Sequence, residues 1–437
     1  MAHIEPFHAL RYDSAKVPLA QVATQPYDKI TPEMQERYYD ASPYNLVTVI
    51  LGKRSPNDGP EDNPYTRAAV LFQNWRRENV FLQDPEPSIY RYTQQFSAPI
   101  SGLQFERRGF IALGKLEDYS AGIVFRHEQT LAKPKADRLD LLRATRAHFE
   151  QIFMLYSDPL GEIEKALEPA ELPIIELPDE YGVVHRVWRV ADPATIDFVR
   201  RKMDEKKLII ADGHHRYETA LNYRNERRQN AGKPGARNPS ARPPYELTMM
   251  TFVNMESPGL LILPTHRVVH GLANFSAASF RDAACAYFGV EEVDNSITAE
   301  RATAILREAG RTGTALLAVA DERSFLLSRP RAPDSTFEGL SVRQQSLDVV
   351  QLHKCILEGV LGISAEAIRD QQNVIYVRDT GEAMNIVRSG QANLALLMNP
   401  VHMRQVRDLA FAGEVLPQKS TDFYPKLLSG LTVYALE

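Results

Sequence analysis

Hydrophobic and polar positions along the first half of the chain predict an alternation of strands and helices. Residues 64–80 (PYTRAAVLFQNWRRENV) carry apolar side chains at helical spacing, whereas residues 45–52 (NLVTVILG) form a β-branched apolar run that is typical of a strand. Residues 88–97 and 107–117 have the pattern of two antiparallel strands. An amphipathic helix is expected within residues 135–153, and it leads into a strand at residues 152–157.

The second half continues with two apolar strands, residues 246–255 (ELTMMTFVNM) and 259–269 (GLLILPTHRVV). Beyond residue 270 the pattern predicts a helix, a second helix, a hairpin and a third helix, at residues 279–290, 299–310, 314–328 and 347–362. This alternation favours a mixed α/β (α+β) fold over a helical bundle.

The length of 437 residues exceeds what one hydrophobic core usually supports, so we expect two domains. An N-terminal α/β domain over residues 1–270 would carry the His127-Glu128 and Asp212–Arg216 motifs, and a C-terminal α/β domain over residues 271–437 would contribute the Lys419–Thr421 loop. Residues 229–245 are rich in Gly, Pro and Asn without apolar periodicity, which predicts a mobile loop or an interdomain excursion.

Charge and cysteine content narrow the function classes. The net charge of -5 would repel a polyanion, so nucleic acid is not an expected partner. The two cysteines, Cys285 and Cys355, lie far apart, which fits a reducing compartment. The start MAHIEPFHALRYD lacks the pattern of a signal peptide, and no apolar run approaches the roughly 20 residues that cross a bilayer. We expect a soluble cytoplasmic protein with no membrane partner.

The densest group of ionisable residues is LIIADGHHRYETALNY, residues 208–223. An apolar run, the turn signal Asp212-Gly213 and helical spacing after it predict a strand, a tight turn and a helix. The turn would aim His214, His215 and Arg216 and the first helical amides at one place, which favours an anion, and phosphate first. Asp212 would suit a magnesium ion or a hydroxyl awaiting deprotonation.

Two other interpretations of this turn stay open. In the first, Asp212 caps the helix, Gly213 only turns the chain, and the histidines are surface residues. Cationic residues at a helix N-terminus oppose the helix dipole, however, and need something to offset them. In the second, His215 binds zinc, but adjacent histidines point in different directions on a helix and no further His or Cys follows at ligand spacing.

Three further motifs offer groups that bind anions. RHEQTLAKPKADR (residues 126–138) supplies cations beside a carboxylate, LPTHRVV (263–269) sets polar residues after an apolar strand, and LPQKSTDFYPKLLSGL (416–431) places bases and hydroxyls between prolines. The last lacks G-x-x-x-x-G-K-[ST], which rejects a Walker-type site. A solvated helix face and a structural histidine are the alternatives for the first two. The candidate residues are His127, Glu128, Lys133, Arg138, His266, Arg267, Lys419, Ser420, Thr421 and Lys426.

The segment ADGHHRYETAL (residues 211–221) resembles the hallmark of the domain of unknown function 1015 family, a widespread bacterial family without a defined biochemistry. Matching segments follow in the same order over nearly the whole chain: PFHALRYD, QPYDKIT, HEQTLAKPKADRLDLL, LPTHRVVHGL and AGEVLPQKSTDFYPKLLSGL. Several separate motifs in one order identify the chain as similar to this family, and the resemblance implies no particular activity.

A second, local resemblance concerns only the turn. Asp-Gly-His-His-Arg is similar to the phosphate-binding turn of the ParB and sulfiredoxin-like superfamily, which includes free-serine kinases and nucleotide-dependent DNA-segregation proteins. The resemblance implies that Asp212, His214, His215 and Arg216 match a turn that binds nucleotide phosphate beside a serine hydroxyl.

Together these features favour a phosphotransferase that acts on a small hydroxylated metabolite such as serine, with ATP or ADP as the donor and Mg²⁺ as the metal. Asp212, His214, His215 and Glu128 are the expected catalytic residues, with Asp212 also the expected metal ligand. The expected phosphate- or substrate-binding residues are Gly213, Arg216, His127, Lys133, Arg138, His266, Arg267, Lys419, Ser420 and Thr421.

Two other functions remain alternatives at this stage. One is a non-catalytic, nucleotide-binding regulator. The other is a metal-dependent hydrolase in which His127, His214, His215 and Asp212 coordinate a transition metal.

Overall fold

The computed structural model describes residues 2–99, 101–128, 132–231 and 242–436, without the side chains of residues 132–134 and 231. The chain has a mixed α/β fold and groups into two compact units. Unit 1 comprises residues 1–126, 130–260 and 425–437, and unit 2 comprises residues 127–129 and 261–424. From the sequence we expected one boundary, at residue 270. In this grouping residues 425–437 return to unit 1, and residues 127–129 belong to unit 2. Most of the loop expected at residues 229–245 lies outside the described residues.

Unit 1 is built on a mixed sheet in the order β6-β11-β8-β12-β5-β4-β10-β9, with β1 paired to β5. Strand β12 runs parallel to β8 and antiparallel to β5, and β11 runs antiparallel to β8. The strands are β1 (Ile4–Glu5), β2 (Leu10–Tyr12), β3 (Phe81–Gln83), β4 (Ile89–Ser97), β5 (Gln104–Lys115), β6 (Val124–Phe125), β7 (Ala147–His148), β8 (Ile152–Tyr156), β9 (Ile175–Pro178), β10 (Val184–Val190), β11 (Leu208–Asp212), β12 (Leu247–Asn254) and β21 (Tyr434–Ala435).

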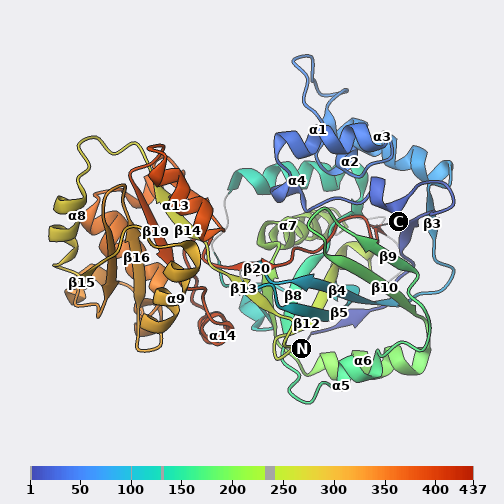
Figure 1. Cartoon of the computed structure of the whole chain (residues 1–437). Helices are drawn as coiled ribbons and strands as arrows, with labels where there is room; N and C mark the ends of the chain where they lie inside the picture. Colours follow the sequence, from blue (N-terminus) through green and yellow to red (C-terminus); the bar gives the residue numbers. More distant parts are fainter. Residues whose placement is uncertain (1, 100, 129–131, 232–241, 437) are drawn as a thin grey trace. The chain divides into compact units, whose positions relative to one another are not determined.

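Helices cover this sheet, with α5 and α6 bordering it on the side away from α1, α3 and α4 (Figure 1). Side chains of α5, α6 and α7 share one buried cluster with β8, β11 and β12, and side chains of α2, α3 and α4 share another with Phe149 and Val433. The helices are α1 (Pro32–Ala41), α2 (Val47–Ile50), α3 (Pro64–Arg77), α4 (Ala132–Thr145), α5 (Glu162–Ala166), α6 (Pro193–Asp204) and α7 (His214–Ala231), with 3-10 turns η1 (Leu19–Gln21), η2 (Tyr27–Lys29), η3 (Tyr119–Ala121) and η4 (Pro244–Glu246).

Most expected elements of unit 1 are confirmed, including α3, α4, the antiparallel pair β4 and β5, and the strand, turn and helix at residues 208–231. The strand expected at residues 45–52 is wrong, because residues 47–50 form the short helix α2. Val47, Val49 and Ile50 are almost completely buried, and Asn45 Oδ1 accepts a hydrogen bond from the amide of Val47 at 2.9 Å. A short apolar run does not distinguish a strand from a buried helical turn, so packing decides.

Unit 2 is built on an antiparallel sheet in the order β15-β17-β16-β19-β14-β18. The strands are β13 (Leu261–Leu263), β14 (His266–Val269), β15 (Gly289–Val293), β16 (Ala315–Val319), β17 (Ser324–Ser328), β18 (Val374–Val377), β19 (Leu394–Met398) and β20 (Asp422–Tyr424). The helices are α8 (Ala277–Ala284), α9 (Ala299–Ala309), α10 (Val342–Gln345), α11 (Asp348–Gln351), α12 (Ala365–Arg369), α13 (Thr380–Arg388) and α14 (Met403–Phe411), with the 3-10 turn η5 (Asp334–Phe337) and the π-helix η6 (Leu352–Val360).

The helices and the hairpin expected beyond residue 270 are confirmed as α8, α9, the pair β16 and β17, and α11 with η6. The apolar run at residues 259–269 is divided, because Pro264 separates β13 from β14. Strand β13 pairs with β20, whereas β14 pairs with β18 and β19 in the main sheet. Proline cannot donate to a ladder, which explains why pairing changes at this position.

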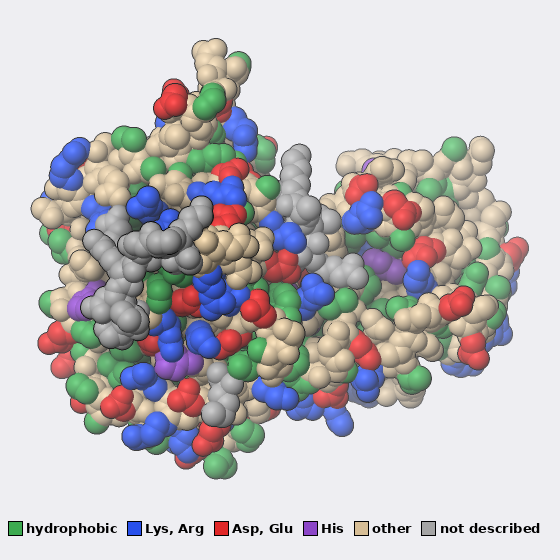
Figure 2. Space-filling view, turned by 180° about the vertical axis from the view of Figure 1, so that it is seen from behind, with side chains coloured by type: hydrophobic (Ala, Val, Ile, Leu, Met, Phe, Trp, Pro, Cys, Tyr) green, Lys and Arg blue, Asp and Glu red, His purple; other side chains and the backbone are tan. Residues whose placement is uncertain are grey.

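No helix among the residues that the structure describes has both the length and the apolar content needed to cross a membrane. On the face that Figure 2 shows, basic and acidic side chains lie interspersed rather than separated by sign. The described side chains on this face therefore form no broad basic patch of the kind that binds a polyanion.

Candidate functional site

The Asp212 turn (residues 212–216) connects the end of β11 to the start of α7. Asp212 pairs with Phe153 of β8 after an irregularity in register at the end of the strand. Gly213 has φ +92°, and its carbonyl accepts the amide of Tyr217 at 2.9 Å. The first amides of α7 therefore face the region beyond the end of β11, as they do at the N-terminus of any helix. The sequence predicted this local geometry correctly.

Two cations contact the carboxylate of Asp212. Arg216 donates from Nη2 to Oδ2 at 2.9 Å, and Lys426 donates from Nζ to Oδ1 at 3.4 Å. The side chains of Asp212, Arg216 and Lys426 are 23%, 11% and 9% exposed, so the group is partly shielded from water. Shielding strengthens these interactions relative to those of an exposed pair.

The surroundings of Asp212 favour its ionised form. Burial alone would raise the pKa of the carboxyl, but Lys426, Arg216, Lys29 and His214 together lower it well below its usual range. Asp212 is therefore a carboxylate at any pH near neutrality. Such a group accepts hydrogen bonds or meets cations well and is a weak base.

Arg216 points back beneath the turn. Its Nη1 donates to the carbonyl oxygen of Gln151 at 2.5 Å, while Nη2 reaches Asp212. A Cβ atom at Gly213 would lie 3.0 to 3.1 Å from the guanidinium of Arg216, so this position requires glycine for its space as well as for its positive φ. Burial lowers the pKa of Arg216, but Glu150, Asp212 and Asp28 raise it by more. The protein itself thus occupies two of the nitrogens that we expected to hold phosphate.

The segment that carries Lys426 is fixed by two side chains of the sheet. Arg107, from β5, donates to the carbonyl oxygen of Pro425 at 2.5 Å, and Gln94, from β4, donates to that of Lys426 at 2.8 Å. The guanidinium of Arg107 is buried, also donates to Gln94 and lies 4.7 Å from the ring centroid of Phe153. Burial lowers the pKa of Arg107 to about 10, so it remains a cation at neutral pH.

A second polar group lies behind the turn around Glu150. Its Oε1 accepts the amide of Tyr27 at 3.0 Å and the hydroxyl of Ser429 at 3.5 Å, and its Oε2 lies 4.0 Å from Arg138. Arg138 stacks over the ring of Tyr27, 4.2 Å from the centroid, and donates to the carbonyl oxygen of Ile50 at 2.6 Å. Arg138 thus has several partners within the protein, and its expected role at a phosphate stays a prediction.

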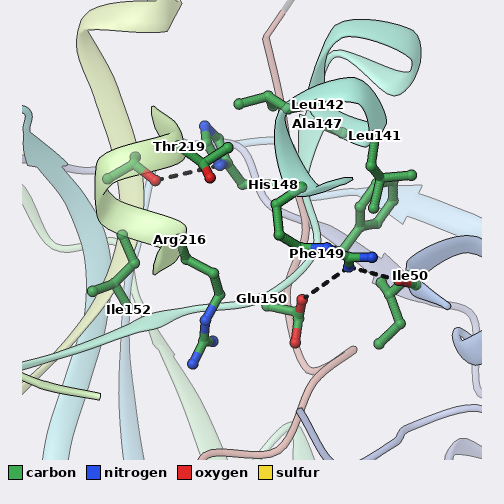
Figure 3. A pocket seen from close by; sticks show the side chains of 12 residues that line it. Ile50, Leu141, Leu142, Ala147, His148, Phe149, Glu150, Ile152, Arg216 and Thr219 are labelled. Carbon is green, nitrogen blue, oxygen red and sulfur yellow. Dashed lines mark hydrogen bonds and ion pairs between the residues drawn. The ribbon is translucent and has the colours of Figure 1, made fainter. Parts of the chain in front are cut away.

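A small pocket lies between α4, α7 and the residues before β8. Arg216, Glu150, His148 and Thr219 are among the residues that line it (Figure 3). Its volume is about 50 Å³, whereas one water molecule takes about 30 Å³ of the liquid. The pocket therefore has room for one or two waters and is too small for a nucleotide. Burial lowers the pKa of His148 to about 4, so this histidine is neutral.

The two histidines of the turn differ in exposure. His214 is buried, with 8% of its surface exposed, and His215 is half-buried. His214 is close enough to Asp212 to lower the pKa of its carboxyl. The capping interpretation of Asp212 stays an alternative, and its carboxylate also meets two cationic side chains. The catalytic roles expected for the histidines stay predictions.

Most of the other expected site residues belong to unit 2, where several contact one another. We call this group the Lys419 cluster: His127, Glu128, Arg267, Lys419, Ser420 and Thr421. His127 Nε2 lies 2.8 Å from Thr421 Oγ1, and Glu128 Oε1 accepts the amide of Lys419 at 3.1 Å. Lys419 has φ +57°, and its carbonyl oxygen accepts from Arg267 at 3.2 Å. These motifs therefore meet as a group, while their expected roles at a phosphate stay predictions.

Three expected residues remain outside the cluster and the turn: Arg138, whose contacts are given above, His266 and Lys133. His266 is buried at 1% exposure, lies 3.0 Å from Thr380 Oγ1 and accepts the amide of Met398 at 3.3 Å. Burial, aided by Arg267, lowers the pKa of His266 to about 4. These contacts fit the structural interpretation of His266. The side chain of Lys133 lies outside the described residues.

Sequence reasoning missed the contact between Lys426 and Asp212, and it missed Lys29, Arg107 and Glu150 altogether. Lys426 stands in a recognised motif, but it is not among the residues expected to bind phosphate or substrate. Lys426 directly follows Pro425, which comes after the aromatic residues 423–424. This is the single local signal in the sequence that points to Lys426. Arg107 carried the stronger signal, because a charged residue at the start of a buried strand pattern usually has a specific partner.

Within the described ranges, no three side chains of His, Cys, Asp or Glu form a group that could hold a metal ion. His127 belongs to unit 2, whereas Asp212, His214 and His215 belong to unit 1. The donor set expected for the hydrolase alternative therefore has no support from the described geometry.

Comparisons with known proteins give one family and a fold-level likeness. The model of a family described as "Protein of unknown function (DUF1015)" matches residues 4–350. The search of curated proteins finds no match. A mutant of free serine kinase in complex with AMP aligns with a TM-score of 0.38 and 13% identity, over 72% of this chain and 87% of that chain.

Two further solved structures align at a similar level. A conserved hypothetical protein from Pyrococcus furiosus has a TM-score of 0.37 and 12% identity, over 74% of this chain and 95% of that chain. SbnI with a C-terminal truncation, from Staphylococcus aureus, has a TM-score of 0.34 and 9% identity, over 74% of this chain and 87% of that chain. At this level of similarity, the roles of residues in those proteins are not transferred to the site of this chain.

Proposed function

The chain belongs to the DUF1015 family of proteins of unknown function, and we propose that unit 1 binds a phosphate-bearing ligand, a nucleotide in particular, at the Asp212 turn. The observation that carries this proposal is the ionised carboxylate of Asp212 between Lys426, at 3.4 Å, and Arg216, at 2.9 Å, at the start of the 18-residue helix α7. Lys29 also acts on the same carboxylate. Glu150 and Asp28 also act on Arg216, so the ammonium groups of Lys426 and Lys29 and the first amides of α7 are the groups that would attract a further anion.

Each group has a distinct part in the proposed complex. The amides of the first turn of α7 and the ammonium groups of Lys426 and Lys29 would receive phosphate oxygens. Arg216 would act as a positioning residue, because it ties Asp212 to the backbone of Gln151 from below. Asp212 would accept the hydrogen bond of a substrate hydroxyl and orient its oxygen toward phosphorus.

We propose phosphoryl transfer to a small hydroxylated metabolite such as serine as the reaction. The hydroxyl oxygen attacks the terminal phosphorus of ATP or ADP, the bond from phosphorus to the bridging oxygen breaks, and the shortened nucleotide leaves with that oxygen. The hydroxyl proton passes to Asp212 or to water. Because Asp212 is a weak base, it takes the proton late, when the oxygen is already bonded to phosphorus.

Magnesium fits the turn only together with phosphate. Asp212 is a single carboxylate, and Lys426 and Arg216 already face it. A bare Mg²⁺ ion would meet these two cations at short range, whereas the phosphates of a nucleotide bring negative charge and further oxygen ligands. We therefore expect no binding of Mg²⁺ alone.

The low pKa of Asp212 favours one second candidate, a regulator that binds nucleotide without turnover. Asp212 is ionised and is a weak base. Such a carboxylate suits a site that only binds nucleotide as well as a site that transfers phosphate. The two candidates share the site and differ in the product. Phosphoserine detected by ³¹P NMR after incubation with ATP or ADP, Mg²⁺ and serine would distinguish them.

Calorimetric titration of the full chain with ADP, ATP and pyrophosphate, each with and without Mg²⁺, tests the proposal. We expect saturable binding that falls at least about tenfold in Lys426→Met, because hydrogen bonds to charged groups contribute about 1.5–3 kcal/mol. Lys202→Met is the matched control, since Lys202 pairs with Glu162 at 2.8 Å on the surface of α6. Absence of binding in the wild type, or equal affinity in both variants, would overturn the proposal.

A further inference from the structure

Unit 2 contains a cavity of about 320 Å³ that no part of the proposed function uses. It lies between the π-helix η6, helix α12, Tyr376 of β18 and the loop of residues 415–418. The cavity opens to the surface beside the exposed Ala365, and cavities of about 300 Å³ or more are the usual size of small-molecule sites. A cavity of this volume therefore has room for a small-molecule ligand.

The wall of the cavity is mainly apolar, with Leu340, Val350, Ile368, Val415 and Leu416 as its large aliphatic members. Contacts within unit 2 hold the loop that forms one side. The amide of Leu416 donates to the carbonyl oxygen of His127 at 2.8 Å, and Gln344 donates to that of Val415 at 3.0 Å. The wall is thus a fixed surface that suits the apolar body of a ligand.

The polar side of the cavity is formed by η6. His353 is 8% exposed and lines the cavity, and its buried Nε2 atom has no hydrogen-bond partner among the residues that the structure describes. Buried polar atoms are nearly always satisfied, so a small rotation of this ring toward the cavity would let a water or a ligand group supply the missing partner. The π-helical turn that presents His353 is of a kind that often occurs at functional sites.

The charges around His353 define the ligand group that fits beside it. Burial, together with Arg267 and Lys354, lowers the pKa of His353 well below its ordinary value. The ring is therefore neutral and lies in a positive potential. Lys354 also lines the cavity, and its ammonium pairs with Glu358 at 2.8 Å. A neutral imidazole can donate from Nε2 to an oxygen, and the positive potential favours an oxygen that carries negative charge.

We propose that this cavity binds a small monocarboxylate with an apolar body, its head group beside His353 and Lys354 and its body against Leu340, Val350 and Ile368. The site is separate from the Asp212 turn, and the proposal does not rest on nucleotide binding by unit 1. It assigns a binding site for an apolar acid to unit 2.

The test is a titration of the full chain with octanoate, followed by calorimetry, with octylamine and acetate as comparison probes. We expect saturable binding of octanoate, and at least tenfold weaker binding of octylamine, which has the wrong charge, and of acetate, which lacks the apolar body. Octylamine binding as tightly as octanoate would overturn the assignment of the head group. No saturable binding of octanoate would overturn the site.

Two variants locate the binding. Ala365 lines the cavity but is exposed, so Ala365→Trp blocks the space with little effect on folding, and we expect it to abolish octanoate binding. Glu366→Trp is the matched control, since Glu366 is exposed on the same helix and does not line the cavity. Lys354→Met should weaken octanoate at least tenfold. Binding that survives Ala365→Trp, or that Glu366→Trp removes equally, would place octanoate elsewhere.

Discussion

The ammonium of Lys426 lies 3.4 Å from the carboxylate of Asp212, although 214 residues separate them in the chain. Arg107 and Gln94 fix the backbone at residues 425–426, and the short strand β21 pairs with β7 farther along. The last residues of the chain thus belong to unit 1 and supply a cation to its turn. The site is completed by a segment that follows the whole of unit 2 in sequence.

Removal of the carboxylate should destabilise unit 1. In Asp212→Asn, Lys426 and Arg216 remain partly buried without their anion, and breaking such a pair costs about 3 kcal/mol. Urea unfolding at pH 7 measures the loss. Asp197→Asn is the control, because Asp197 is exposed and pairs with Arg200 at 3.5 Å. Equal free energies for the two variants would contradict a stabilising role of the Asp212 group.

The same variant predicts a pH dependence. The pKa of Asp212 in the folded protein lies below the ordinary value of about 3.9, so its contribution is complete above that value and disappears as the pH falls through the lowered pKa. The difference between wild type and Asp212→Asn should therefore be constant from pH 7 to pH 5 and shrink below pH 4. Unfolding free energies at pH 7, 5, 4 and 3 measure it, and a difference that grows with acidity would contradict the sign.

Gly213 should tolerate a side chain less well than another glycine of positive φ. Gly213→Ala and Gly161→Ala both force alanine into a left-handed conformation, at φ +92° and +62°, which costs about 1 kcal/mol. Only the Cβ at residue 213 also meets a neighbour, the guanidinium of Arg216, at 3.0 to 3.1 Å. We expect a loss of about 2 kcal/mol and weaker ADP binding for Gly213→Ala alone. Equal effects would show that Arg216 moves aside freely.

Arg216→Lys should behave as a non-conservative change. One ammonium cannot reproduce the two bonds from separate guanidinium nitrogens to Gln151 and Asp212. We expect a loss of about 2 kcal/mol in urea unfolding and a drop in ADP affinity through the displaced carboxylate. Arg200→Lys on the surface of α6 should leave both measurements unchanged. Unaltered ADP affinity in Arg216→Lys would remove the positioning role.

His266 should make unit 2 sensitive to moderate acid. Its pKa is about 4 in the folded protein and about 6.5 when unfolded, so the folded state resists protonation in this interval. Stability is complete above pH 6.5 and falls by about 3 kcal/mol at pH 4 through this residue. The variant His266→Gln lacks this titrating group, so the unfolding free energy of the variant should fall less between pH 7 and pH 4 than that of the wild type. Parallel losses in both proteins would show that His266 titrates normally.

Local patterns predicted the elements whose formation depends on neighbouring residues. The turn at Asp212-Gly213 follows from an apolar run, a turn dipeptide and helical spacing within 16 residues, and the pair β4 and β5 follows from two adjacent β-patterns. The error at residues 47–50 has the opposite cause. Three apolar residues and a threonine fit a strand or a helical turn equally well, and the packing of α2 against α1 and α3 selected the helix.

The sequence by itself determined the strand, the glycine turn and the helix that carry Asp212, because hydrogen bonding and backbone freedom over a few residues suffice for them. Tertiary structure alone decided that Lys426, rather than Lys419, contacts Asp212, and that Lys419 meets Glu128 instead. Coulomb attraction depends on distance in space and not on position in the sequence. Any of the 51 lysines and arginines could therefore pair with a carboxylate. The fold of unit 1 makes the selection, because Arg107 and Gln94 hold the backbone at residues 425–426 and so place Lys426 beside Asp212.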